Sequence, residues 1–136
     1  MAYFSETAYG ADGVWISGAL SATRGTTAGV LIWVNPEEGA VLVDAILLDV
    51  TTAATSSVCT LDVGATTSSI VITDTMIDGA DISTTARIYN HLKDAGTNGV
   101  RVVKVAKGKW ITGTEKTGDV TGLVGTYYIH YKKVRS

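Results

Sequence analysis

The stretch that most constrains the fold of this chain lies close to its C-terminus. Residues 122–134 read GLVGTYYIHYKKV, a run of β-branched and aromatic side chains that ends in basic residues. Such side chains pack well on a half-buried pleated surface, so the run predicts one long strand. Because side chains alternate across a strand, Tyr127, Ile129 and Tyr131 share one face and the residues between them share the other. We expect the first face to enter the core.

The rest of the chain predicts shorter strands separated by turns that contain glycine. We expect strands at residues 14–20, 28–34, 40–51, 58–63, 68–73, 100–106 and 110–115. Within 40–51 the sequence is apolar except at Asp44 and Asp49, and this odd spacing predicts a bulge or bend near Ala45. Seven or eight strands without a long helical pattern predict an all-β fold, a jelly-roll-like antiparallel β-sandwich.

The middle of the chain is the least strand-like part. We expect strands 58–63 and 68–73 to form a hairpin through residues 64–67. At most one or two short helical turns are predicted. One lies around Met76 and Ile77, with Asp74 as N-cap and Gly79 as the stop signal, and the other begins near Ile88.

Length and composition predict one domain that associates with other subunits. The 136 residues are 46% hydrophobic and 18% charged, which is more apolar than a typical soluble chain. Residues 28–136 are assigned to the sandwich, and residues 1–27 to an N-terminal arm or an edge strand of the same domain. The aromatic residues of this first segment are candidate contacts for a partner surface; they are Tyr3, Phe4, Tyr9 and Trp15.

Charge and cysteine content exclude several classes of function. A net charge of −2 gives no field that would hold nucleic acid or an anionic membrane, so neither partner is expected. No apolar run approaches the roughly 20 residues of a membrane helix, and we expect no leader peptide. The single cysteine, Cys59, excludes an intrachain disulfide. It alternates in phase with Leu61 and Val63, so we expect it to be buried.

No catalytic motif is found, and we expect neither an enzyme nor a cofactor. His91 and His130 lack the spacing of a metal site. Asp74, Asp78 and Asp81 offer oxygen ligands for calcium, but carboxylates beside a glycine are also typical of caps and turns, and the sequence favours that interpretation.

The three tryptophans divide into one core residue and two surface residues. Trp33 lies in an apolar strand and is expected in the core. Trp15 and Trp110 are candidate surface anchors or, if they stand in a row, a platform for a sugar.

Three short segments carry a family resemblance, namely MIDGADI at residues 76–82, DAGTNG at 94–99 and GLVGTYY at 122–128. Together they resemble a small β domain of structural proteins from tailed bacteriophages, among them head decoration proteins, also called cement or auxiliary capsid proteins. The resemblance covers about residues 28–134.

The resemblance implies a non-enzymatic virion protein on the outer surface of the capsid, made in the host cytoplasm. Such proteins typically form jelly-roll homotrimers that bridge neighbouring major capsid proteins, so the implied partners are the major capsid protein and the chain itself. An alternative function is that of a carbohydrate- or receptor-binding jelly-roll module in a virion fibre or head appendage.

Overall fold

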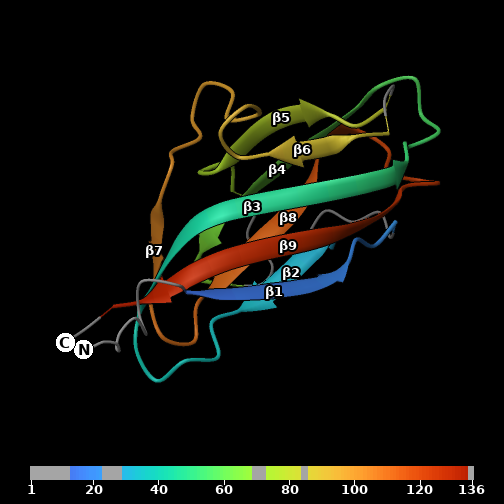
Figure 1. Cartoon of the computed structure of the whole chain (residues 1–136). Helices are drawn as coiled ribbons and strands as arrows, with labels where there is room; N and C mark the ends of the chain where they lie inside the picture. The colour runs from blue at the N-terminus through green and yellow to red at the C-terminus, as the bar shows by residue number, and fades with distance from the viewer. Residues whose placement is uncertain (1–12, 23–28, 69–72, 84–85, 135–136) are drawn as a thin grey trace.

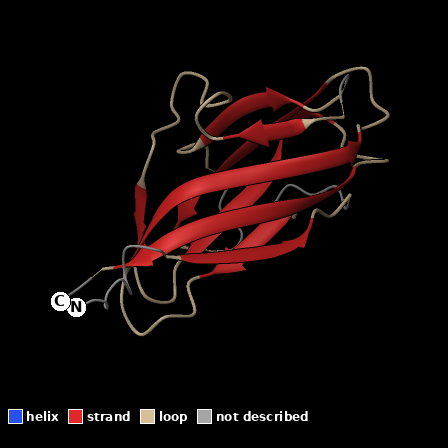
Figure 2. Cartoon of the chain, viewed as in Figure 1, coloured by secondary structure: helices blue, strands red, loops and turns tan. Residues whose placement is uncertain are grey.

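The computed structural model describes residues 13–22, 29–68, 73–83 and 86–134. Strands and loops make up these residues, and none of them lies in a helix (Figure 2). Accordingly, the described part contains no helix of the length and hydrophobicity that would cross a membrane. The strands are β1 (Val14–Ala19), β2 (Leu31–Val34), β3 (Val41–Thr52), β4 (Cys59–Thr66), β5 (Ile77–Asp81), β6 (Ile88–Asn90), β7 (Val103–Val105), β8 (Trp110–Gly118) and β9 (Val124–Lys133).

The strands form two antiparallel sheets packed face to face (Figure 1). The first sheet has the order β1-β9-β3-β6, with β7 also paired to β3, and the second has the order β2-β8-β4-β5. With β7 set aside, the chain pairs from its ends inward: β1 with β9, β2 with β8, β3 with β6, and β4 with β5. This wrapped pairing across two sheets is the jelly-roll arrangement, so the predicted fold is confirmed.

Strand β9 is central, as the sequence predicts. It pairs with β1 on one side and with β3 on the other. Ile129 and Tyr131 are buried in the core, and Tyr127 packs against it. Trp33 from the opposite sheet also packs against the core, with its ring centroid 5.3 Å from that of Tyr131. The prediction that Trp33 belongs to the core is therefore confirmed.

Strand β3 contains the predicted bulge. Its pairing with β9 shifts register between Val43 and Ala45, which makes Asp44 the extra residue. Val43 lies in the core before the bulge, and Ile46 lies in the core after it. These positions differ by an odd number, and a regular strand would turn one of them outward. The bulge therefore lets both halves of an apolar run face the same core.

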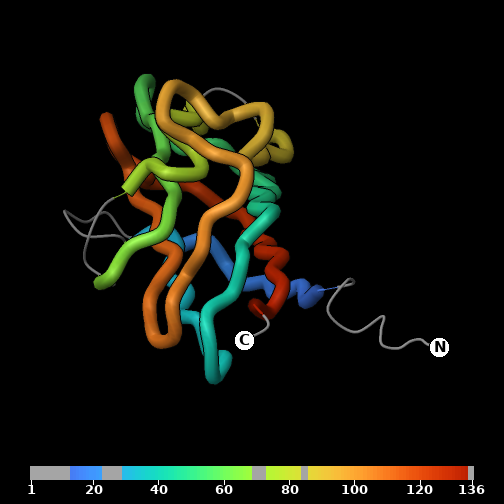
Figure 3. Tube along the Cα trace, turned by 90° about the vertical axis from the view of Figure 1, so that its left-hand side faces the viewer, coloured from blue at the N-terminus to red at the C-terminus, as the bar shows by residue number. Residues whose placement is uncertain are grey.

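A buried asparagine fixes the end of the sandwich where the β2–β3 loop lies beside the β7–β8 turn (Figures 1 and 3). The side-chain amide of Asn35 donates to the carbonyl oxygen of Gly39 at 3.0 Å and to that of Val105 at 3.1 Å. The backbone N–H of Asn35 donates to the carbonyl of Lys109 at 2.8 Å. The loop predicted at residues 35–39 thus holds β7 and β8 as well as turning the chain.

The predicted helical turns are wrong. Ile77 begins β5, and the side chains of Met76 and Ile77 are both fully buried. The backbone pairs with β4, where Met76 N donates to the carbonyl of Val63 at 3.0 Å. Burial of two consecutive side chains under the sheet outweighs the local capping signal at Asp74. Ile88 likewise lies in a strand, β6. It is followed by one hydrogen-bonded turn at 91–93.

The predicted hairpin partner of β4 is also wrong. Strand β4 continues through Gly64 to Thr66, where a turn was expected, and its partners are β5 and β8. Residues 69–72 of the expected strand lie outside the described residues. Strand β7 is shorter than the predicted 100–106. Cys59 is fully buried, as predicted.

Glycine substitutions test the tight approach of β4 to the end of β8. Gly118 has φ of +82°, and a Cβ there would overlap the carbonyl oxygen of Val58. Gly108 has a similar φ of +72° but faces open space, and Gly39 has neither constraint. We expect Gly118→Ala to lower the free energy of unfolding by more than about 2 kcal/mol, Gly108→Ala by about 1 kcal/mol and Gly39→Ala by less than about 0.5 kcal/mol.

Urea unfolding followed by tryptophan fluorescence measures these three free energies. Equal stability of the Gly118→Ala and Gly39→Ala variants would contradict the described strand end.

Candidate binding surface

The outer face of the first sheet gathers apolar side chains from four strands. Residues between the core positions of β9 point away from the second sheet, and the strand register places their neighbours beside them. Trp15 lies opposite His130, and Tyr128 lies opposite Leu47. We call this surface the Trp15 face and define it by Trp15, Leu42, Leu47, Ile88 and Tyr128.

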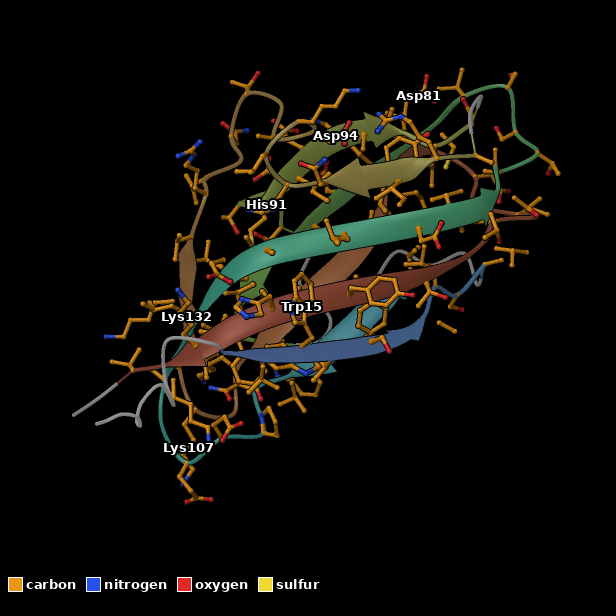
Figure 4. The ribbon with its side chains drawn as sticks, viewed as in Figure 1. Trp15, Asp81, His91, Asp94, Lys107 and Lys132 are labelled. Carbon is orange, nitrogen blue, oxygen red and sulfur yellow. The ribbon has the colours of Figure 1, made fainter. Side chains whose placement is uncertain are left out.

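Large apolar side chains on the Trp15 face are open to solvent. Trp15 is 55% exposed and Ile88 is 57% exposed, and Leu42 and Tyr128 are also exposed. Figure 4 shows Trp15 in front of β9, on the side turned away from β2 and β8. A group of exposed large apolar side chains on one sheet face is typical of an interaction site.

The Trp15 ring is backed by a fixed polar pair. Its centroid lies 4.8 Å from that of His130, with 50° between the ring planes. His130 Nδ1 lies 2.5 Å from Asp44 Oδ1, and Lys132 Nζ lies 3.7 Å from Asp44 Oδ2. Gly13 has φ of +67°, and a Cβ there would collide with the His130 ring, so the chain enters β1 directly beside it. An exposed ring held in this way loses little conformational entropy on binding.

The proposed row of Trp15 and Trp110 does not exist. Trp110 lies in β8 of the second sheet, where its neighbour Ile111 points into the core, so Trp110 points to the outer face of that sheet. Trp15 points outward from the first sheet. The two rings therefore face opposite sides of the sandwich. On the Trp110 side, Ile32 is 45% exposed and Val34 is also exposed.

The candidate calcium residues are only partly brought together. Asp74 and Asp78 lie close to Asp62, with one carboxylate oxygen from each within 4.8 Å of the others. Asp81 is engaged elsewhere, because its Oδ1 accepts hydrogen bonds from Ser83 N at 2.9 Å and from Ser83 Oγ at 2.6 Å. Sequence reasoning missed Asp62 because it lies on β4 and reaches the other two through the β4–β5 pairing.

Donors from the protein occupy this acidic cluster. Asp78 accepts from Lys116 Nζ at 2.8 Å and from Asn98 N at 3.1 Å. The hydrogen bond from Lys116 is the main reason that the pKa of Asp78 is lowered. Burial raises the pKa of Asp62, and the hydrogen bond from Gly79 N partly opposes this effect. The cluster thus ties β4, β5, β8 and the 94–99 turn together, which agrees with the turn interpretation.

Cys59 lies in the core between the sheets. Burial raises the pKa of its thiol to about 11, so the thiol stays protonated at neutral pH. A protonated, fully buried thiol is a poor nucleophile.

The structure describes only part of the predicted N-terminal segment, residues 1–27. Trp15 belongs to β1, so the edge-strand interpretation holds for residues 14–19. Leu20 is buried in the core. Tyr3, Phe4 and Tyr9 lie outside the described residues.

Comparisons of the chain with protein-family models, with curated proteins and with solved structures gave no match.

The acidic cluster generates a test of its ion pair. Lys116→Met should lower Tm at low ionic strength, because the repulsion among Asp62, Asp74 and Asp78 is then no longer offset, and added sodium chloride should reduce the difference. Lys107→Met removes an exposed pair with Glu38 and serves as the matched control with no expected change in Tm.

We expect millimolar calcium to leave the Tm of the unsubstituted protein unchanged. A calcium-dependent rise in Tm that Asp62→Asn abolishes would contradict this interpretation.

Proposed function

We propose that this chain is a non-enzymatic structural protein that decorates the outside of a tailed-bacteriophage capsid and binds the major capsid protein through the Trp15 face. The observation that carries the proposal is the exposed Trp15 ring backed by His130 and Asp44. The family resemblance of residues 76–82, 94–99 and 122–128 supplies the kind of partner.

Contact energetics support a docking role for this face. Buried aromatic side chains contribute disproportionately to protein interfaces, with typical truncation costs of about 2 kcal/mol or more. Beside Trp15, the carboxylate of Asp44 is close to both His130 and Lys132, so its negative charge is offset at that point of the face. A surface with several exposed apolar side chains suits an apolar patch on a protein partner.

A homotrimer belongs to the same proposal. Three copies related by symmetry multiply weak individual contacts through avidity, which allows modest surfaces to hold neighbouring capsid subunits together.

Residues 1–12 precede Gly13, which lies beside His130 at the margin of the Trp15 face. We therefore include Tyr3, Phe4 and Tyr9 among the proposed contacts. We propose residues 1–12 alone as the arm, because Val14–Ala19 form β1 and Leu20 is buried in the core.

A carbohydrate-binding module is the second candidate. The platform of Trp15 with Trp110 is excluded by their positions on opposite sides of the sandwich. Trp15 and Tyr128, however, are exposed aromatic rings on one face, and aromatic rings can stack on sugars. This candidate predicts the same surface and a different ligand.

Binding to capsid particles tests the proposal. Particles assembled without the chain are mixed with the purified protein, and bound protein is quantified after sedimentation. We expect Trp15→Ala to weaken binding by about thirtyfold, because a loss of about 2 kcal/mol corresponds to this factor. The matched control is Ile32→Ala, which removes an exposed apolar side chain from the opposite face and should leave binding unchanged.

Equal binding by the Trp15→Ala and Ile32→Ala variants would reject the Trp15 face as the docking surface. Absence of binding by the unsubstituted protein would reject the capsid proposal. In that second case, a glycan-array signal that Trp15→Ala removes would support the carbohydrate candidate.

A further inference from the structure

His91 completes the ladder between β3 and β6 with its side chain. His91 N donates to the carbonyl of Ile46 at 3.2 Å, as in a regular antiparallel pair. The reciprocal bond does not use the carbonyl of His91: Ile46 N donates to His91 Nδ1 at 3.2 Å instead. The chain leaves the sheet in the turn at 91–93, so the imidazole takes the place of the departing backbone.

This hydrogen bond fixes the protonation state of His91. An Nδ1 that accepts a hydrogen bond carries no proton, so the ring is neutral and its proton is on Nε2. His91 is only 4% exposed, and Nε2 is buried without a hydrogen-bond partner among the described residues. Burial lowers the pKa of His91, and nearby backbone groups and the charge of Asp44 offset only part of this shift.

The other side of the same bulge is held by the second histidine. His130 on β9 contacts the carboxylate of Asp44, and Lys132 approaches the same carboxylate. The two histidines of the chain therefore hold residues 44–46 from opposite sides, His91 from the turn after β6 and His130 from β9. Figure 4 shows His91 on the β6 side of β3 and Lys132 on β9.

We propose that the β3 bulge is an acid-sensitive clasp, in which protonation of His91 releases the end of β6 from β3 while the His130–Asp44 contact keeps β3 joined to β9. The inference goes beyond the proposed function and does not depend on it.

Protonation of His91 removes its hydrogen bond to β3. A proton from solvent binds Nδ1, so the N–H of Ile46 then faces another N–H and its hydrogen bond breaks. The charged ring is buried, and the nearby Asp44 carboxylate is already engaged by His130 and Lys132. Arg101, from the β6–β7 connection, adds no negative charge.

Other contacts limit the opening to the end of β6. Tyr89 remains buried and its hydroxyl donates to the carbonyl of Asp81 at 2.8 Å. Arg87 and Asp94 form an ion pair at 2.8 Å that holds the turn to the start of β6. Neither contact involves His91, so we expect both to persist when the ring is charged.

The pH dependence follows from the lowered pKa. The unfolded or opened chain binds a proton at His91 near pH 6.5, whereas the closed clasp binds it only at lower pH. The contribution of His91 to stability is therefore complete above about pH 6.5. It is lost as the pH falls from there through the pKa of the closed state.

Amide hydrogen exchange at Ile46, measured by NMR in the full chain between about pH 5 and 7.5, tests the clasp. We expect the protection factor of Ile46 to fall by up to about tenfold per pH unit below about pH 6.5. In His91→Gln, a non-titrating carbonyl can accept from Ile46 N, so protection should be independent of pH. The matched control His130→Gln should retain the pH dependence. Protection that is flat in the unsubstituted protein, or that falls equally in His91→Gln, would overturn the proposal.

Ring nitrogen chemical shifts provide a second test that needs no substitution. We expect His91 to carry its proton on Nε2 at neutral pH and to titrate below about pH 6.5, together with the loss of Ile46 protection. A ring protonated at Nδ1 at neutral pH, or one that titrates at or above 6.5, would overturn the clasp.

Discussion

The pairing of β3 with β9 through a bulge is the constraint on which the rest of the structure depends. Both strands lie inside the first sheet, and the bulge at Asp44 keeps the apolar residues before and after it in the core. The bulge also leaves two polar groups that need hydrogen-bond partners. It places the Asp44 carboxylate on the sheet surface, and it disturbs the ladder next to the N–H of Ile46. His130 contacts the carboxylate, and His91 accepts the Ile46 N–H. The same strand irregularity therefore explains the positions of both histidines and the support beneath Trp15.

Much of the fold can be predicted because its strongest signals are local. The alternation of Tyr127, Ile129 and Tyr131 is sufficient to define a long strand with one buried face. The odd spacing of Asp44 and Asp49 within an apolar run is sufficient to predict the bulge. The prediction for the segment around Met76 is wrong because the local signals, an N-cap and a glycine stop, favour a helical turn. Its backbone donor instead pairs with Val63 across the sheet, a contact that sequence spacing does not reveal.

The candidate surface could not be predicted because its members are distant in the chain. Sequence reasoning grouped Trp15 with its chain neighbours Tyr3, Phe4 and Tyr9, or with Trp110 by residue type. In the structure, Trp15 shares a face with Tyr128 from β9, Leu47 from β3 and Ile88 from β6. Strand order and register decide this grouping. The acidic cluster illustrates the same limit, since Asp62 joins it from β4 and Asp81 points to Ser83.

The most direct test of the central role of the bulge is the urea unfolding transition of a chain from which Asp44 alone is deleted. Deletion restores a regular strand and turns one half of β3 by one position, so that either Val43 or Ile46 must leave the core. We predict the loss of the cooperative unfolding transition in urea, whereas deletion of the exposed Ser57 in the β3–β4 loop should preserve it. A variant without Asp44 that unfolds as cooperatively as the Ser57 deletion, and at the same urea concentration, would contradict this role.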